Sequence, residues 1–370
     1  MFAMVAAKQM LIAALLLISG TIASAATYTI INLSPRLPST WRFLGNDVGS
    51  NANHFLGMGY SSPGPAGQYT FIYRNGIVTR IGTLPGATFT LGNDHNHAGQ
   101  VTGAAFTVDP NGYTFTATRA FLYSNGKLTD LSELGAFKGR ESFGHAINKK
   151  GQVVGNWTDA TNVARAFLYS NGKMITDIGS LGPGTGTRAN AINNVGQITG
   201  QSSAGQWPHA FLYDKGSMQD IGALTAPPSD FSLGVGINDA GQIIGRSRVD
   251  NFHTHGFIYE NGVMKDMGTL GGSESYPVQI NNAGVVVGYS TPAGANVGSH
   301  LAFVFSNGKM QAINAAIDTA DPLFTRISHT EAVAINDAGE IVTKGVDQRT
   351  GLVNYYLLRP KPSATRQRSR

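Results

Sequence analysis

Short apolar runs alternate with turns of Asn, Asp and Gly along most of the chain. One such phrase reads INDAGQIIG at 237–245, with apolar residues on both sides of an Asn-Asp-Ala-Gly turn. It predicts a β-hairpin, because Asn, Asp and Gly accept the backbone angles of a tight turn. Clear copies stand at 146–155, 191–200, 279–288 and 334–342, and weaker copies at 94–103 and 48–57. The chain therefore repeats this hairpin seven times.

A second phrase alternates with the first. It is an apolar strand followed by a turn, as in AFLYSNG at 120–126 and 166–172, and it leads into a strand of the type Met-x-Asp-Ile-Gly. Each unit thus contains four short strands, which we name A to D in chain order. Successive units are 43 to 55 residues apart. Four antiparallel strands in a repeat of this length are typical of one blade of a β-propeller.

The two ends of the repeat predict how it closes. The seventh unit stops after its strand C at 355–358, whereas the segment TYTIINLS at 27–34 precedes the first unit and aligns with strand D. We therefore expect an all-β fold, a seven-bladed β-propeller of four-stranded blades, in which the N-terminal strand completes the last blade and closes the ring. A two-domain β-sandwich is the alternative, but it does not account for the regular count.

The repeated residues also resemble a known family. His209-Ala210-Phe211-Leu212-Tyr213, together with the phrases Met-x-Asp-Ile-Gly and Ile-Asn-x-x-Gly-Gln, is similar to the repeat of the HAF-repeat family of extracellular proteins. The resemblance covers about residues 90–345. The first His of the motif is kept in His209 and His255 and is replaced in Arg119, Arg165 and Leu301. The resemblance implies an exported bacterial β-repeat protein and brings no catalytic residue with it.

The N-terminus has the three-part pattern of a secretory signal peptide. Lys8 precedes an apolar run from Met10 to about Ile18, and small residues follow at Ala23-Ser24-Ala25. We expect a signal peptide at 1–25, the propeller at 26–358 and a basic, disordered tail at 359–370. An uncleaved membrane anchor is the alternative for the first segment, but the run is shorter than the about 20 residues that span a bilayer. The expected location is outside the cell or in the periplasm of a bacterium.

Composition narrows the class of protein further. The chain has no Cys, so its stability must come from a core rather than from disulfides. Its formal net charge is +5, and the five arginines and lysines of the 359–370 tail account for all of it. The rest of the chain has no basic stripe, which argues against a nucleic-acid partner. After signal removal no segment is apolar enough to enter a membrane, and we expect a monomer.

The connections indicate where a ligand would bind. The turns from A to B and from C to D are short, whereas the connections from B to C and from D to A are long and unlike one another. The long connections should all emerge on one side, and loops of this kind often carry function. Two inserts, 104–118 and 314–330, are the longest. We expect any ligand there or at the mouth of the central channel.

Large aromatic, arginine and histidine side chains near these loops are the candidate binding residues. They would suit a sugar or peptide surface. The alternative is that the aromatic rings fill space between blades. The candidates are Trp157, Trp207, Tyr60, Tyr289, Arg188, Arg246, His253 and His255.

Recurrent polar residues have a structural explanation. Asn238 and its equivalents stand just before a turn, and Asp130, Asp177, Asp220 and Asp266 end strand D, so both sets can hydrogen-bond nearby backbone. His95 and His97 form a metal-like pair, and His253 and His255 form a second, but no third ligand can be assigned to either. We expect neither metal nor cofactor.

These observations favour a non-catalytic binding scaffold that uses the long-loop side to hold a glycan, a cell-envelope component or a protein. The alternative is a propeller-type glycan hydrolase or lyase. Two or three carboxylates gathered at the channel mouth would favour the enzyme, but the acids in the long loops belong to different units.

Overall fold

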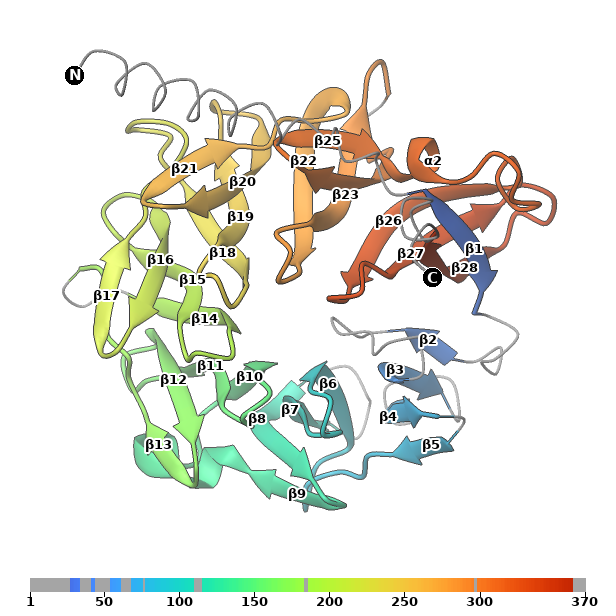
Figure 1. The fold of residues 1–370 in the computed structure, drawn as a ribbon. Helices are drawn as coiled ribbons and strands as arrows, with labels where there is room; N and C mark the ends of the chain where they lie inside the picture. Colours follow the sequence, from blue (N-terminus) through green and yellow to red (C-terminus); the bar gives the residue numbers. More distant parts are fainter. Residues whose placement is uncertain are drawn as a thin grey trace, which may run out of the picture.

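Seven four-stranded antiparallel sheets surround a central axis (Figure 1). The computed structural model describes residues 27–33, 41–43, 54–60, 68–75, 77–109, 115–182, 186–295 and 298–361. The predicted signal peptide at 1–25 lies outside these residues, as does the chain beyond Lys361. The architecture is the predicted seven-bladed β-propeller, almost entirely β.

Each sheet is one blade and follows the predicted order of strands. Blade 1 consists of β2 (Trp41–Phe43), β3 (His54–Tyr60), β4 (Gln68–Arg74) and β5 (Ile77–Arg80). Blade 2 consists of β6 (Phe89–His95), β7 (Val101–Val108), β8 (Phe115–Ser124) and β9 (Lys127–Asp130). Blade 3 consists of β10 (Ser142–Ile147), β11 (Val153–Thr158), β12 (Ala164–Ser170) and β13 (Lys173–Ile175).

The next three blades repeat the pattern. Blade 4 consists of β14 (Thr187–Ile192), β15 (Ile198–Ser203), β16 (Pro208–Asp214) and β17 (Ser217–Asp220). Blade 5 consists of β18 (Ser232–Ile237), β19 (Ile243–Arg248), β20 (Thr254–Glu260) and β21 (Val263–Asp266). Blade 6 consists of β22 (Gly271–Ile280), β23 (Val286–Pro292), β24 (Leu301–Ser306) and β25 (Lys309–Ala312). One short α-helix, α2 (Ile313–Ala316), and the 3-10 turns η4 (Leu131–Glu133) and η5 (Gly135–Phe137) lie between strands.

Blade 7 combines the two ends of the described chain. Its strands are β26 (Ile327–Ile335), β27 (Ile341–Asp347), β28 (Val353–Pro360) and, at the outer edge, β1 (Tyr28–Asn32). Strand β1 runs antiparallel to β28, with Ile30 opposite Leu358. Leu33 and Leu357 of this blade pack in one cluster with Phe55 and Phe71 of blade 1. This strand pairing is the contact on which the predicted closure depends.

The 314–330 insert packs on β1. The backbone N–H of Asp318 donates to the carbonyl of Tyr28 (2.9 Å), and the carboxylate of Asp321 accepts from the N–H of Ile30 (2.8 Å). Ile317 forms an isolated parallel bridge with Tyr28 and is buried in the same cluster as Ile30. The 314–330 insert, one of the two candidate ligand loops, therefore holds the N-terminal strand β1 in place through hydrogen bonds and packing.

Other boundaries differ modestly from the prediction. Strand β28 continues through Pro360, two residues past the expected end of the propeller at 358. Arg359 forms an ion pair with Glu340 (3.0 Å), and Lys361 pairs with Asp318. The basic character of the segment suggested a tail, but two of its cations neutralise acids of blade 7 and its neighbour. The 104–118 insert mainly lengthens β7 and β8.

The antiparallel order places all short turns on one side of the disc. We call this the turn side, and the side with the long connections the loop side. The hairpin turns from C to D have the predicted left-handed Asn, for example Asn125 at φ 49° and Asn261 at φ 53°. Lys215, which replaces Asn in blade 4, takes φ 50° as well.

Close approach of strands A and B explains the repeated Gly of strand B. A Cβ on Gly200 would lie 1.9 Å from the carbonyl oxygen of Arg188, and one on Gly245 would lie 2.1 Å from that of Leu233. Strand A is bulged at this point in both blades. On the other side of strand B, Phe211 and Phe257 of strand C are fully buried. The hydrophobic core thus lies between neighbouring blades, where the buried side chains of one sheet pack against those of the next.

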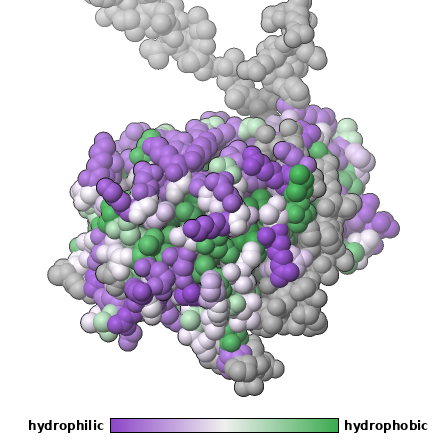
Figure 2. Space-filling model, turned by 90° about the horizontal axis from the view of Figure 1, so that it is seen from below, coloured by the Kyte–Doolittle hydropathy of each residue, from purple (hydrophilic) through white to green (hydrophobic). Residues whose placement is uncertain are grey.

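The outer rim is less regular. Figure 2 shows this rim, with hydrophobic residues visible between more hydrophilic ones. Exposed apolar residues on outer strands include Ile77, Ile175 and Val263. Among the described residues, no helix has both the length and the apolar character needed to cross a membrane.

Candidate functional site

A polar cavity of about 330 Å³ opens around the central axis on the turn side. It is lined by the ends of strand A and the following turns from blades 2 to 7. Polar lining residues include His145, Lys149, Asn194, Asp239 and Asp337. Their hydrogen bonds decide whether this cavity is free to hold a ligand.

The turn Asn of each blade links it to the next. The side-chain oxygen of Asn193 accepts the backbone N–H groups of its own turn, including Gln197 (2.8 Å), as predicted from its position. Its Nδ2 also donates to the carbonyl of Asn238 in the next blade (2.9 Å), a contact that the sequence did not indicate. The same link joins Asn96 to Asn148, Asn148 to Asn193, Asn238 to Asn281 and Asn281 to Asn336. We call these five links the asparagine belt.

A second set of links uses the next residue of the turn. Asp239 accepts from the backbone N–H of Asn194 (2.8 Å), and Asp337 accepts from that of Asn282 (2.9 Å). Burial alone would raise the pKa of Asp239, but hydrogen bonds from the amides of Asn194 and Asn282 outweigh it and lower the pKa. The carboxylates at the cavity mouth are therefore engaged in holding blades together.

The aspartates of strand D cap the following loop as expected. Asp220 accepts from the N–H of Gly222 (2.7 Å), and Asp266 from that of Gly268 (2.7 Å). They also bind the residue at the first position of the HAF-like motif. His209 pairs with Asp220 and His255 with Asp266, both at 2.9 Å. In blades 2 and 3 the same pair is Arg119 with Asp130 (2.7 Å) and Arg165 with Asp177 (3.7 Å).

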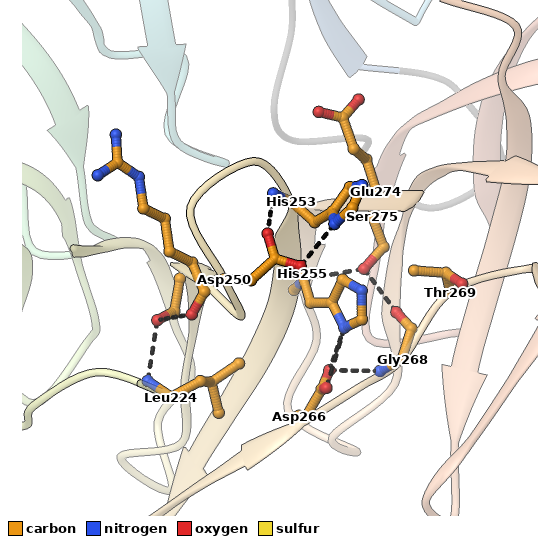
Figure 3. A network of polar contacts seen from close by, with 12 residues as sticks. Leu224, Asp250, His253, His255, Asp266, Gly268, Thr269, Glu274 and Ser275 are labelled. Atoms are coloured by element: carbon orange, nitrogen blue, oxygen red, sulfur yellow. Dashed lines mark hydrogen bonds and ion pairs between the residues drawn. The ribbon is translucent and has the colours of Figure 1, made fainter. Parts of the chain in front are cut away.

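His255 therefore has a structural role, although it was a candidate ligand residue. In Figure 3 its ring lies against Asp266, below the loop that carries Asp250 and His253. His253 pairs with Asp250 at 2.6 Å, and the pKa of Asp250 is lowered to about 2, first by this hydrogen bond and then by backbone donors of the same loop. His253 is more exposed than His255 and remains accessible on the loop side.

Trp157 is a core residue. Its side chain is buried, its ring stacks on Phe137 at 5.4 Å, and its Nε1 donates to the carbonyl of Thr176 (2.6 Å). For this candidate the interpretation that aromatics fill space is the right one. Tyr60 lies in β3, but its side chain is outside the described residues.

Trp207 belongs to a small stack on the loop side. Its Nε1 donates to the carbonyl of Pro228 (2.7 Å), and the guanidinium of Arg248 lies 4.2 Å from the centre of its ring. The same guanidinium lies 5.8 Å from the centre of the Phe231 ring. The stack brings together the loops of blades 4 and 5.

Arg246 and Tyr289 are brought together through a residue that was not predicted. Tyr276 stacks on Tyr289 at 5.1 Å and receives the guanidinium of Arg246 at 5.3 Å from its ring centre. His300 lies 4.8 Å from the ring of Tyr289. Burial, followed by a hydrogen bond to Glu274, raises the pKa of Tyr276 to about 12. We call Arg246, Tyr276, Tyr289 and His300 the aromatic cluster.

Arg188 is the exposed arginine of blade 4 and lies near His145 of blade 3. The pKa of His145 is lowered mainly by burial, with a smaller contribution from Arg188, against a hydrogen bond to Asn156 that raises it. Arg188 and the aromatic cluster occupy the same level of the repeat. At this level a residue of strand A pairs with the residue of strand B that directly follows the repeated Gly, as Phe143 pairs with Asn156 next to Gly155.

We call this level the variable level, because its residues differ from blade to blade. The neighbouring level is small almost throughout, as in Gly144 opposite Gly155 and Ala189 opposite Gly200. An alignment of strands A and B would therefore have identified Tyr276. The pairs at the variable level are Arg42–Met58, Leu91–Ala104, Phe143–Asn156, Arg188–Gln201, Leu233–Arg246, Tyr276–Tyr289 and Glu331–Lys344.

His95 and His97 do not form a metal site with their neighbours. His95 is buried at the end of β6, His97 is exposed in the following turn, and both rings approach His54 edge-on, at 4.6 and 6.2 Å. In the part of the chain with described coordinates, no three His, Cys, Asp or Glu residues are grouped so that they could hold a metal ion.

Comparison with known proteins identifies the fold. No family model matches the chain, and no curated protein matches it. A puromycin-hydrolyzing peptidase of Mycobacterium tuberculosis is similar in structure, with a TM-score of 0.50 and 10% identity over 90% of this chain and 56% of that one. The chain therefore spans little more than half of that peptidase.

Two further structures have lower scores. The β-propeller domain of the Trilobed protease from Pyrococcus furiosus has a TM-score of 0.45 and 13% identity, over 74% of this chain and 83% of that chain. TolB from Acinetobacter baumannii has a TM-score of 0.40 and 11% identity, over 89% and 86%. At these scores the two similarities carry no argument of their own, and the β-propeller is given by the seven sheets of the structure.

Proposed function

We propose that the chain is an exported, non-catalytic binding protein that holds a glycan on the loop side of blades 4 to 6. Export is inferred from the signal-peptide pattern at 1–25, and the HAF-like motif supports an extracellular repeat protein. The observation that carries the proposal is the aromatic cluster, in which Tyr276 and Tyr289 stack beside Arg246. Flat rings next to hydrogen-bonding side chains suit a sugar ring with its hydroxyl groups.

The repeat itself explains why this surface is a better candidate than the turn-side cavity. Polar groups around the cavity, such as Asn194 and Asp239, hydrogen-bond each other and link blades. The variable level has no common structural residue, so its arginines and aromatics are not required by the repeat. Residues that differ among otherwise similar blades are therefore the ones available for a ligand.

A glycan hydrolase is the second candidate, and one observation favours it. The Oδ2 atoms of Asp239 and Asp337 lie 3.2 and 3.0 Å from the same Asn282 Nδ2, so the two carboxylates share one donor in the lining of the cavity. Glycosidases use a pair of nearby carboxyl groups, but one of them must carry a proton at working pH. The pKa of Asp239 is lowered rather than raised. This favours binding over hydrolysis.

The loop-side acids point the same way. Asp159 binds Arg165, Asp230 lies 3.2 Å from His209, and Asp250 binds His253. Each carboxylate thus has a partner in its own or the adjacent loop, and the three are spread over different blades.

A glycan array probed with the mature protein tests the proposal. Hits should be measured again by calorimetry with Trp207→Ala and His300→Ala, which are expected to weaken binding at least tenfold. Val263→Ala, on the outer strand of blade 5, is the matched control and should bind as the parent does. If no glycan binds, or if both variants bind normally, the proposal fails. Turnover of chromogenic glycosides that is lost in Asp337→Asn would support the enzyme instead.

A further inference from the structure

We infer that the ligand held on the loop side is an acidic sugar, whose carboxylate is bound by Arg246. The inference rests on the proposed function and adds the chemical class of the ligand. It depends on how arginines are used elsewhere in the propeller, on the surroundings of Arg246, and on the geometry of a guanidinium group.

Arginines at structural positions of this protein have carboxylate partners. Arg119 binds Asp130 at 2.7 Å, Arg165 binds Asp159 at 2.8 Å, and Arg359 binds Glu340 at 3.0 Å. Arg326 binds Asp347 through two nitrogens. These pairs neutralise the arginine charge within the fold. An arginine that is paired in this way does not need an external anion.

Arg188 and Arg246 differ from that group. They occupy the variable level of adjacent blades, Arg188 on strand A of blade 4 and Arg246 on strand B of blade 5. Within the described ranges of the chain, neither has an Asp or Glu oxygen within 4.0 Å. Both cations are therefore uncompensated on the same side of the disc.

The surroundings of Arg246 make the lack of an anionic partner energetically unfavourable. Its Nε is buried and has no hydrogen-bond partner among the described residues, while its guanidinium lies against the ring of Tyr276. A buried N–H of a charged group without an acceptor is unfavourable, because the water it gave up is not replaced. The tyrosine ring offers its face to the cation and no acceptor to Nε. An incoming anion would supply that acceptor.

The acids nearby are already committed. Glu274 hydrogen-bonds Tyr276, and Asp250 is held by His253. Asp220 hydrogen-bonds Nδ1 of His209, and an oxygen of Asp230 lies 3.2 Å from Nε2 without hydrogen-bond geometry. The loop side of blades 4 to 6 therefore presents Arg188, Arg246 and Arg248 as cations, with the carboxylates turned to other partners.

A carboxylate fits this arrangement better than a neutral hydroxyl. The planar guanidinium donates two parallel N–H bonds to the two oxygens of a carboxylate. Tyr276 and Tyr289 beside it provide a flat apolar surface for the sugar ring that carries the group. A uronic acid combines both features within one residue.

Oligomers of galacturonate and their methyl esters make a matched pair of probes, since esterification removes the charge and keeps the rings. The acid should bind at least tenfold more tightly than the ester at low salt, and the difference should shrink as salt is added. Arg246→Gln should remove most of this preference, because it weakens binding of the acid much more than binding of the ester. Arg349→Gln, an exposed arginine of blade 7 on the same side, is the control and should keep the preference. Arg246→Lys, with thermal unfolding of each variant, separates loss of the fork geometry from loss of fold.

The outcomes are distinguishable from those of the proposed function. Equal binding of acid and ester, or array hits confined to neutral or sulfated sugars, overturns the acidic-sugar inference and leaves the glycan-binding function intact. An unchanged preference in Arg246→Gln overturns the assignment of the site. An array without any hit removes both proposals together.

Discussion

The Nδ2 of Asn148 donates to the backbone oxygen of Asn193, 45 residues later and one blade further round, at 2.9 Å. The same side chain holds its own turn through Oδ1, which accepts from the N–H groups of Lys150 and Gln152. One short side-chain amide thus shapes a hairpin and joins two blades. This double use explains why Asn occupies the same turn position in six of the seven blades.

Asn148→Ala should lower the free energy of unfolding by about 2–4 kcal/mol, because it removes the acceptor of the Lys150 and Gln152 N–H groups and one of the two donors to the Asn193 carbonyl. Lys150→Ala, at an exposed position of the same turn, is the control and should change stability by less than about 0.5 kcal/mol. Urea unfolding followed by tryptophan fluorescence measures both. Equal stability of the two variants would show that the belt contributes nothing.

The pairing of β1 with β28 can be tested by a disulfide, since the chain has no Cys to interfere. Thr29 and Arg359 are directly opposite each other in the register. Thr29→Cys with Arg359→Cys should form a cross-link under mild oxidation and raise the stability by about 2–4 kcal/mol over the reduced form. The pair Thr29→Cys with Lys361→Cys is out of register and should cross-link poorly. If both pairs react alike, the register is wrong.

Gly200→Ala should destabilise the protein strongly. The added methyl group would lie 1.9 Å from the carbonyl oxygen of Arg188, so strands A and B of blade 4 would have to separate. Gly205→Ala, where no atom lies within 4 Å, is the matched control in the loop of the same blade. A fall in the melting temperature confined to Gly200→Ala is the expected result; similar melting temperatures would contradict the close contact.

His329 should make the fold sensitive to acid. Burial lowers its pKa from 6.5 to about 4 in the folded state, against a smaller opposite effect of Asp321. The unfolded chain therefore binds a proton between these values that the folded chain does not bind. The stability attributable to the neutral His is complete above pH 6.5 and falls by about 3 kcal/mol as the pH drops to 4.

His329→Gln should flatten this slope, because the titrating group is gone. Its Nδ1 lies 2.7 Å from Thr343 Oγ1, a contact that a Gln side chain can also make, so the variant is expected to fold. Unfolding curves at several pH values between 4 and 7 compare the two proteins. A variant with the same pH slope as the parent would assign the sensitivity to other groups.

The first position of the HAF-like motif should tolerate exchange between His and Arg. His209 pairs with Asp220 just as Arg119 pairs with Asp130, so His209→Arg should retain the parent stability. His209→Ala is expected to cost up to about 1 kcal/mol, the usual range for a partly exposed polar pair. Thermal unfolding decides; a large loss in His209→Arg would mean that the imidazole has a separate role.

The fold was accessible from sequence because its signals are local. The residues of a hairpin such as 237–245 predict both its turn and its two strands, and the number of copies gives the number of blades. His209 and His255 on strand C and the aspartates at the end of strand D also lie where the repeat predicted them, although their pairing was not foreseen.

The candidate site was less accessible because it depends on which way each side chain faces. Trp157 is two residues after Gly155, whereas Tyr289 is one residue after Gly288. Successive residues of a strand point to opposite sides, so this single step puts Trp157 in the core and Tyr289 beside Tyr276. The contact of Arg246 with Tyr276 joins residues of two adjacent blades, and no local sequence pattern encodes it.

Blade 7 depends on a contact between distant parts of the chain. Strand β1 and its partner β28 are about 320 residues apart in the sequence. Bringing such distant segments together costs loop-closure entropy, so we expect their pairing late in folding. Until β28 is in place, the apolar strand β1 is an unpaired edge that can recruit another chain as readily as its own partner. The completion of blade 7 is therefore the folding step most exposed to aggregation.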